Sequence, residues 1–230
     1  MRTRLGAAVG AVAAWTFPAA AVASDRVAHL LGMQTHLDDR HGVALTFDDG
    51  PHPQGTLAVL DALGRLGAPA AFFLTGEQAL EYPSVAREIV ARGHTVGVHG
   101  HRHRLLTLRG PGESMADLRL AQDAVAHTTG TIPRLYRPPY GVANPAVVLA
   151  ARRAGLRPVL WARWGRDWER RATGASVAAN VTRDLRGGEI LLLHDADHYS
   201  APGSWRTTLA ALPGIAAAVA EAGLSFRALR

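Results

Sequence analysis

Short apolar runs alternate along the chain with longer segments, and each of these segments ends at a glycine. Glycine readily adopts the left-handed conformation that closes a helix, so the pattern predicts helices that end in front of a glycine. These predicted helices span residues 56–66, 84–92, 145–154, 176–186 and 207–222. The apolar runs that follow them predict strands at 70–74, 95–98, 158–161, 190–193 and 225–227.

Two further apolar runs, at 43–47 and 135–137, complete a set of about seven predicted strands. Strands that alternate with helices pair in parallel through right-handed crossovers. We therefore expect an α/β fold, a distorted or incomplete (β/α)7 barrel, with an open doubly wound sheet as the alternative. In such barrels the chemistry lies at the C-terminal ends of the strands, which directs attention to the residues that close each run.

The first strand closes with two neighbouring acids in the stretch GVALTFDDGPHP, residues 42–53. Asp48 and Asp49 follow the buried run directly, and Gly50 and Pro51 then end the strand. Buried carboxylates are costly unless a metal ion or a fixed arginine neutralises them. Adjacent side chains on a strand point to opposite faces, so the two acids need not have the same role. The alternative is a loop that begins with two solvated acids.

Two histidines follow the strand at 95–98, in the stretch HGHRH. His99 and His103 are four residues apart and can face one metal ion together with Asp49. Three protein ligands leave positions open for water and substrate. We expect His101, between them, to lie behind the site or in solvent. The alternative is a solvated histidine-rich turn.

The remaining strand ends also carry polar groups. Arg137 opens the stretch RPPYG, in which two prolines make the backbone rigid. A rigidly held Arg137 can pair with a carboxylate, and the backbone N–H of Tyr140 can face the site as an oxyanion donor. The alternative is a stiff proline loop with a structural role only.

Asp167 and Trp168 follow the apolar run at 158–161 and are further candidates for the site. The alternative is an exposed acid beside a tryptophan that packs in the core. His194 closes ILLLH and is either a satisfied core residue or a general acid.

The composition limits the classes of protein. The 230 residues suffice for one large core or two small ones, and 48% of them are hydrophobic, as in globular proteins. The absence of cysteine excludes disulfides and thiolate metal sites. The net charge is +6, but the arginines are scattered and form no basic stripe studded with aromatic residues, so we predict no nucleic-acid partner.

The first 24 residues differ from the rest of the chain. Arg2 and Arg4 precede an uncharged apolar run at 5–23 that ends in Ala-Val-Ala, before Ser24. This layout predicts a signal peptide in residues 1–24, and hence a secreted protein. An uncleaved membrane anchor, which would place the protein at the cell surface, is the close alternative, and a buried N-terminal helix is the third.

Residues 25–41 form a polar lead-in ahead of the predicted catalytic domain at 42–230. His36, Asp38, Asp39 and His41 imitate a metal cluster, but they precede the first strand and we expect them to be exposed.

Five short motifs now carry a resemblance. TFDDG at 46–50, HGHRH at 99–103, RPPYG at 137–141, DW at 167–168 and LLH at 192–194 occur in the order typical of the polysaccharide deacetylase family. This is the NodB-homology group, or carbohydrate esterase family 4, and the resemblance covers roughly residues 42–227. It implies a distorted (β/α) barrel and metal-dependent removal of acetyl groups from sugars.

The resemblance also implies a role for each matching residue. Zinc is the first choice of metal because two histidines and one aspartate suit it, although cobalt, manganese or nickel would also fit. The implied roles are a general base for Asp48, metal ligands for Asp49, His99 and His103, a brace of the base for Arg137, an oxyanion donor for the Tyr140 amide, a partner of the acid for Asp167 and a general acid for His194.

Two positions depart from the family pattern. The family usually has Ser or Thr after the first metal histidine, where its hydroxyl braces the loop, whereas this chain has Gly100. We therefore expect a less rigid loop there. The family also often has an acid three residues before the Asp of the Asp-Trp pair, whereas this chain has Trp164, which we expect to help shape the sugar cleft.

We thus expect hydrolysis of N-acetyl groups on an acetylated polysaccharide that resembles peptidoglycan or chitin. An O-acetyl esterase acting on a xylan-like glycan would use the same site. A catalytically silent glycan-binding domain is the alternative of another class. The sequence predicts neither the glycan nor the oligomeric state.

Overall fold

A computed structural model of the protein describes residues 25–230. The predicted signal peptide or anchor at 1–24 lies outside these residues and stays a prediction. Within residues 25–230, none of the helices combines the length and the hydropathy that a membrane span requires.

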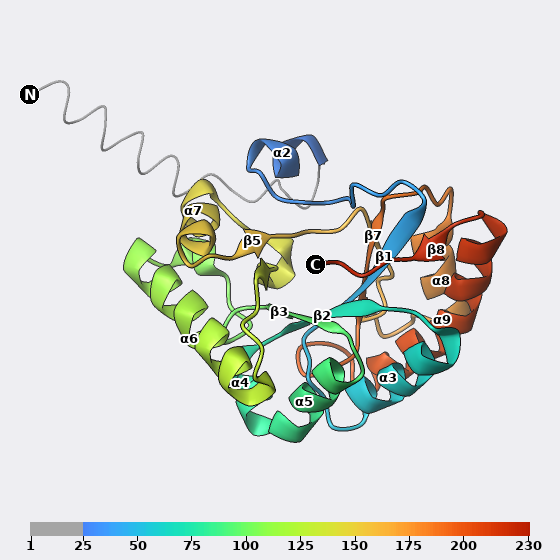
Figure 1. Ribbon diagram of the computed structural model, residues 1–230, viewed down its shortest axis with the longest axis horizontal. Helices are drawn as coiled ribbons and strands as arrows, with labels where there is room; N and C mark the ends of the chain where they lie inside the picture. Colours follow the sequence, from blue (N-terminus) through green and yellow to red (C-terminus); the bar gives the residue numbers. More distant parts are fainter. Residues whose placement is uncertain (1–24) are drawn as a thin grey trace, which may run out of the picture.

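Eight parallel strands form one curled sheet, and helices surround its outer face (Figure 1). The strands are neighbours in the order β5-β4-β3-β2-β1-β7-β6, and β8 pairs with the start of β1. This confirms the predicted distorted barrel. The strands are β1 (Gly42–Asp48), β2 (Ala70–Leu74), β3 (Thr95–Val98), β4 (Leu135–Tyr136), β5 (Arg157–Pro158), β6 (Arg163–Trp164), β7 (Ile190–His194) and β8 (Ser225–Phe226).

The helices begin and end largely where local signals place them. Gly67 closes α3 in the left-handed conformation, with φ of 61°, and the Asn144 side chain caps α7 by accepting the Val147 N–H at 2.9 Å. The helices are α2 (Asp25–Leu30), α3 (Gly55–Leu66), α4 (Gly76–Glu81), α5 (Pro83–Ala91), α6 (Pro111–Thr129), α7 (Pro145–Arg153), α8 (Gly174–Thr182) and α9 (Ser204–Glu221), with the 3-10 turns η2 (Leu106–Leu108) and η3 (Pro139–Gly141).

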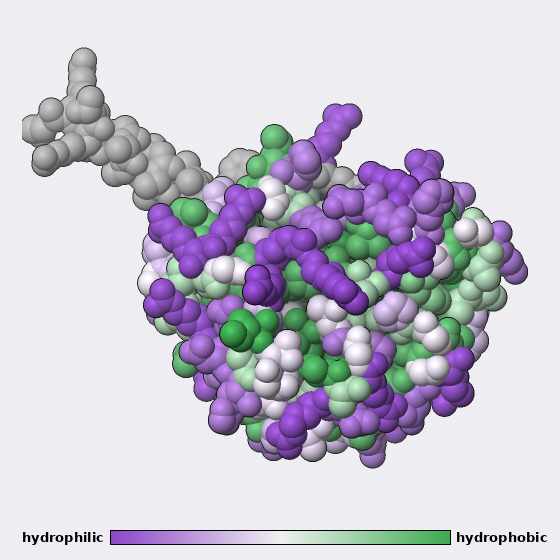
Figure 2. Space-filling view, in the orientation of Figure 1, coloured by the Kyte–Doolittle hydropathy of each residue, from purple (hydrophilic) through white to green (hydrophobic). Residues whose placement is uncertain are grey.

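Strand β1 separates the apolar core from a polar barrel interior. Val43, Leu45 and Phe47 pack in the main core, together with residues of α3 and α9. The alternate residues of β1 face the barrel interior. Ala44 belongs to a smaller apolar cluster there, and Thr46 and Asp48, further along the strand, contact Arg137. Outside, hydrophilic side chains cover much of the face seen in Figure 2, with apolar ones scattered between them. The polar groups of the site therefore stand on an apolar base inside the barrel.

The lead-in at residues 25–41 packs against the sheet. Gln34 forms a parallel bridge with Val159, and His36 an antiparallel bridge with Glu189, so residues 33–37 connect the β5 side of the sheet with the start of β7. Met33 and Leu37 are buried there. Asp38, Asp39 and His41 are exposed as expected, whereas His36 is half-buried.

Helix α6 is the largest element that the sequence pattern missed. Its buried face consists mainly of small residues, Ser114, Ala121, Ala124 and Thr128 among them, instead of a stripe of large apolar side chains. The short elements α2, α4 and β6 were also missed. Strand β6 was missed because its two residues, Arg163 and Trp164, do not form an apolar run.

Two predicted elements end earlier than expected because of long-range contacts. Helix α8 stops at Thr182 instead of 186, and the Arg163 guanidinium from β6 then binds the Arg183 carbonyl oxygen and, at 2.8 Å, the Asp184 carbonyl oxygen. Strand β5 stops at Pro158 because the backbone that follows pairs with Gln34 of the lead-in.

Candidate active site

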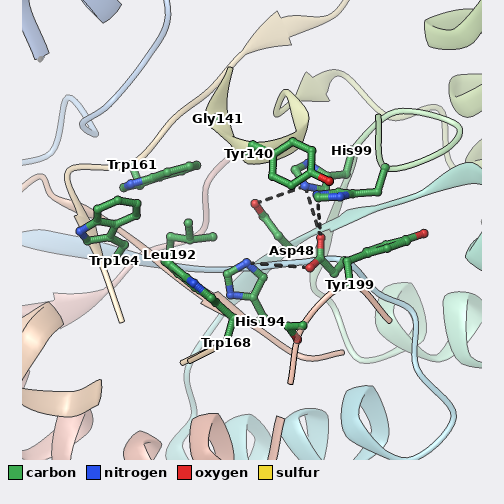
Figure 3. A pocket seen from close by; sticks show the side chains of 13 residues that line it. Asp48, His99, Tyr140, Gly141, Trp161, Trp164, Trp168, Leu192, His194 and Tyr199 are labelled. Atoms are coloured by element: carbon green, nitrogen blue, oxygen red, sulfur yellow. Dashed lines mark ion pairs between the residues drawn. The ribbon is translucent and has the colours of Figure 1, made fainter. Parts of the chain in front are cut away.

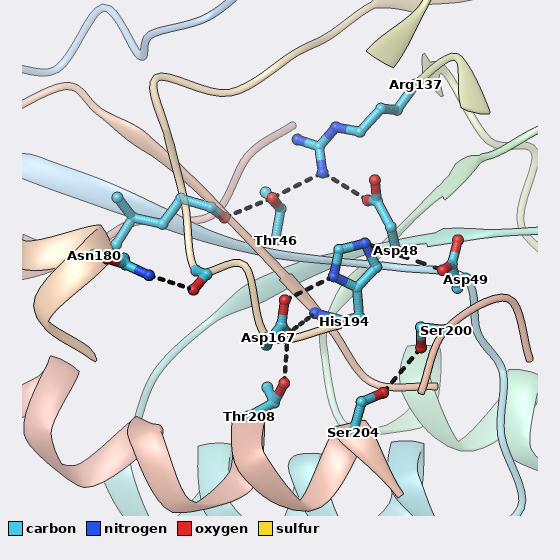
Figure 4. A network of polar contacts seen from close by, with 12 residues as sticks. Thr46, Asp48, Asp49, Arg137, Asp167, Asn180, His194, Ser200, Ser204 and Thr208 are labelled. Carbon is cyan, nitrogen blue, oxygen red and sulfur yellow. Dashed lines mark hydrogen bonds and ion pairs between the residues drawn. The ribbon is translucent and has the colours of Figure 1, made fainter. Parts of the chain in front are cut away.

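The interior end of β1 holds a buried ion pair. The Arg137 guanidinium donates from Nη1 to Asp48 Oδ1 at 2.7 Å and to Thr46 Oγ1 at 2.9 Å, and Nη2 donates to the Leu160 carbonyl oxygen at 3.0 Å (Figure 4). Burial lowers the pKa of Arg137, and the Asp48 carboxylate opposes that shift. The pair therefore presents Asp48 in one fixed orientation, with Oδ2 left for the pocket.

Asp49 is turned toward the same pocket as Asp48, which corrects the expectation from strand alternation. Strand β1 ends at Asp48, and Asp49 has a left-handed backbone with φ of 77°. This places Asp49 Oδ1 3.4 Å from Nε2 of both His99 and His103. The Nδ1 atom of His99 lies 2.8 Å from the Arg137 carbonyl oxygen, which directs Nε2 toward the acids.

These three side chains fit a divalent metal ion. Their ligand atoms lie within 4.8 Å of one another, and Asp49 Oδ1 is buried without a hydrogen-bond partner in residues 25–230. Burial alone would raise the pKa of Asp49, but the adjacent His99 imidazole and the positive charge on nearby His194 lower it to about 2. Burial and His99 lower the pKa of His103 to about 4. An ionised aspartate and a neutral histidine are the forms that bind metals.

A second pair lies at the end of β7, the strand next to β1, with Asp167 buried and His194 half-buried. Nδ1 of His194 lies 2.9 Å from Asp167 Oδ1, and the His194 backbone N–H donates to Asp167 Oδ2 at 2.6 Å. Thr208 of α9 also donates to Asp167 Oδ2. Burial alone would lower the pKa of His194, but Asp167 and the two acids of β1 raise it to about 10. The Nε2 atom of this imidazole lies 4.0 Å from Asp49 Oδ2.

Two tyrosines flank His103. The Tyr199 ring stacks on the imidazole with ring centroids 4.5 Å apart, and the Tyr140 ring meets it edge-on at 4.3 Å. The Tyr199 hydroxyl donates to Glu77 at 2.8 Å. Tyr140 has φ of 60°. Its backbone N–H has no acceptor within residues 25–230.

The polar groups surround a pocket of about 290 Å³ (Figure 3). Trp161, Trp164 and Trp168 form one wall with Leu192, and Tyr140 and Tyr199 stand on the other side. Arg137 and Asp167 do not line it and act from behind, through Asp48 and His194. The structure thus brings all eight sequence-predicted site residues together. His36, Asp38, Asp39 and His41 do not line it, and Asp39 pairs with Arg227.

The loop that carries both histidines is braced by a residue that the sequence analysis did not identify. Asp117 of α6 accepts the His101 backbone N–H at 2.9 Å, and the Gly76 N–H donates to the Gly100 carbonyl oxygen at 3.0 Å. Gly100 has φ of 81°, a conformation that side chains disfavour. The expected looseness at Gly100 is therefore offset by a carboxylate from another element.

The sequence pattern also did not predict that Thr46, Thr208 and Tyr199 contact residues of the site. A signal existed for Thr46, which lies two residues before Asp48 and therefore on the same face of β1. Thr208 and Tyr199 reach the site through contacts that have no local signature.

Comparison with known proteins agrees with this geometry. The sequence profile described as polysaccharide deacetylase matches residues 37–159. A chitooligosaccharide deacetylase of Azorhizobium caulinodans is 34% identical over 83% of this chain and 94% of its own length. The peptidoglycan-N-acetylglucosamine deacetylase PgdA of Listeria monocytogenes is 36% identical over 74% of this chain, which spans only 35% of that protein.

Solved structures show the same fold. A family 4 carbohydrate esterase from Streptomyces lividans, solved in complex with acetate, superposes with a TM-score of 0.74 at 33% identity, over 83% of this chain and 93% of the other. The motifs lie together at the strand ends, the fold is that of a family 4 carbohydrate esterase, and the sequence matches a deacetylase over most of its length. The chain therefore belongs to the polysaccharide deacetylase family, the NodB-homology group of carbohydrate esterase family 4.

Proposed function

We propose that the protein is a metal-dependent hydrolase that removes N-acetyl groups from a polysaccharide containing N-acetylglucosamine, of the peptidoglycan or chitin kind. One observation carries the proposal: an aspartate held by an arginine and a histidine held by an aspartate stand at the ends of adjacent strands, next to a group of residues that could hold a metal ion. The names of the relatives, chitooligosaccharide and peptidoglycan-N-acetylglucosamine deacetylases, support the substrate class.

Asp49, His99 and His103 would hold the metal ion, for which zinc is our first choice and cobalt, manganese or nickel the alternatives. A divalent ion there supplies positive charge that polarises the acetyl carbonyl and lowers the pKa of a water molecule. At about 290 Å³ the pocket is close to the lower end of the usual size of ligand sites, roughly 300 Å³.

Asp48 is the general base of the proposed reaction. Arg137 engages Oδ1, so Oδ2 remains to take a proton from the attacking water. Because Arg137 is buried and itself held by Thr46 and Leu160, it fixes the direction in which Asp48 Oδ2 points. The Tyr140 backbone N–H donates to the oxygen that becomes negative in the tetrahedral intermediate.

His194 is the general acid. Asp167 occupies Nδ1, which leaves the Nε2 proton for the departing amine of the sugar. An amine leaves poorly as an anion, so protonation of the nitrogen is needed when the carbon–nitrogen bond breaks. The base and the acid occupy paired positions on adjacent strands, and both lie next to the proposed metal ligands. Asp48 Oδ2 is 3.8 Å from His99 Nε2, and His194 Nε2 is 4.0 Å from Asp49 Oδ2, so both can act on one reacting group.

Acetate release tests the proposal. Purified protein would be incubated with chitin oligosaccharides, peptidoglycan and O-acetylated xylan, before and after chelation and after addition of zinc. We expect release from N-acetylated glycans, loss with the chelator and recovery with zinc. Release from xylan alone would mean an O-acetyl esterase, and binding of glycans without any release would mean a silent domain.

A further inference from the structure

The wall of tryptophans extends beyond the reacting groups. The Trp168 ring meets His194 edge-on with centroids 5.2 Å apart. Trp164 lies 5.5 Å from Trp168, and Trp161 stacks on Trp164 at 6.1 Å with 26° between the ring planes. The row thus starts beside the proposed acid and leads away from it along one side of the pocket (Figure 3).

Exposed aromatic side chains gather in this pocket. Among the large hydrophobic residues of 25–230 that are exposed, the aromatic ones are Tyr140, Trp164 and Tyr199, and all three line it. Trp164 is 40% exposed. Since removal of apolar surface from water is favourable, a concentration of exposed rings in one concavity is typical of a ligand site.

The backbone holds Trp164 in this orientation. On β6 the neighbouring Arg163 points away from the pocket and binds Glu189 at 2.6 Å, so by alternation the indole faces the pocket. The Gly165 N–H donates to the Leu192 carbonyl oxygen at 2.9 Å, and Asn180 donates to the Gly165 carbonyl oxygen at 2.9 Å. The ring therefore stands on a strand that is fixed from both sides.

A pyranose ring matches such a surface. The carbon-bound hydrogens of an N-acetylhexosamine with equatorial substituents form apolar faces, which pack on an indole, while the hydroxyl groups at the ring edge remain in water. Trp168 and Leu192 already stand next to the reacting groups, so the surface left for a further sugar is that of Trp164 and Trp161.

We propose that Trp164, supported by Trp161, is the binding platform for the sugar unit next to the one that loses its acetyl group. This inference rests on the proposed function and deepens it: the substrate is a chain of N-acetylhexosamines, and longer chains are preferred to short ones.

The test compares chain lengths. Initial rates of acetate release would be measured on the di- and the pentasaccharide of N-acetylglucosamine, with zinc present, for the original protein, Trp164→Ala, Trp164→Phe and Trp164→Asp. We expect Ala and Asp to reduce the preference for the pentasaccharide about tenfold, as is usual for loss of an aromatic contact, mainly through KM. Phe should retain most of the preference.

Controls separate binding from folding. Leu149→Ala removes an apolar side chain of similar exposure, 47%, from α7 outside the pocket, and should leave the preference unchanged. Thermal unfolding would verify that each variant is folded. An unchanged preference in both folded Ala and Asp variants would overturn the platform.

Calorimetry of pentasaccharide binding to metal-free protein supplies a second readout. About tenfold weaker binding by Trp164→Ala supports the platform even if the original protein releases no acetate from any glycan, and in that case only the proposed function fails. Acetate release with equal pentasaccharide binding by both proteins would leave the function intact and overturn the platform.

Discussion

At the scale of single residues, two adjacent acids are held by different partners. Asp48 is fixed by Arg137 inside the barrel, whereas Asp49 leaves the strand with a left-handed backbone and meets two histidines. Strand alternation suggested that the two acids differ, but that reason was wrong because Asp49 is no longer in the strand. The two acids differ because Asp48 binds an arginine, whereas Asp49 lies next to two histidines.

Substitution of each acid should separate these roles. Asp49→Asn is expected to lose most bound metal and the activity with it, because a neutral amide is a poor ligand. Asp48→Asn should keep the metal and lose activity by about 10²–10⁴-fold, the usual contribution of a general base. Elemental analysis and rates of acetate release on both variants would check this. Loss of metal from both would mean that the acids form one ligand cluster.

The His194–Asp167 pair predicts a change in pH dependence. Because Asp167 raises the pKa of His194, Asp167→Asn should lower that pKa, so the acid form is lost at lower pH and the alkaline limb of the activity profile moves toward neutrality. The pH–rate profile would be compared with that of Glu169→Gln, which removes an exposed acid paired with Arg166. An alkaline limb that does not move would refute the pairing.

At the scale of elements, the site depends on a helix that contributes no lining residue. Helix α6 carries Asp117, which accepts the backbone N–H of His101, between the two histidines of the proposed metal site. Burial raises the pKa of Asp117, which indicates that its carboxylate has been taken out of water to make these contacts. The loop is thus positioned by packing of α6 against β3 and α4.

Removal of this brace should loosen the loop. Asp117→Ala leaves backbone donors without their acceptor, which is expected to destabilise the protein by about 1–3 kcal/mol and to weaken zinc binding. Asp123→Ala, an exposed acid on the same helix, is the matched control. Chemical denaturation and zinc titration would measure both effects, and zinc affinity equal to the control would show that α6 does not position the ligands.

At the scale of the whole molecule, distant segments complete the barrel. Residues 33–37 bridge to Val159 and Glu189, so the segment in front of the catalytic strands is part of the folded unit. The predicted domain boundary at residue 42 therefore falls inside the fold.

Export remains a prediction at this scale. The charged start, the apolar run at 5–23 and the Ala-Val-Ala before Ser24 predict cleavage near that serine. Cell fractionation and N-terminal sequencing of the purified protein would test it. Full-length protein in the membrane would favour an anchor, and soluble cytoplasmic protein that retains its first residues would contradict export.

Much of the fold and the eight site residues could be predicted from the sequence, because their signals are local. Helix-closing glycines and short apolar runs mark the alternating elements. Parallel strands bring their C-terminal ends to one edge, so Asp48, His99, Arg137 and His194 must come near each other once the barrel is recognised.

What only the tertiary structure decided are the contacts that hold those residues. Thr46 donates to the Leu191 carbonyl oxygen 145 residues away and accepts from Arg137 91 residues away. Thr208, Asp117 and Tyr199 likewise act on residues from other elements. Periodicity and capping describe neighbours along the chain, whereas these partners are set by how the helices pack on the sheet.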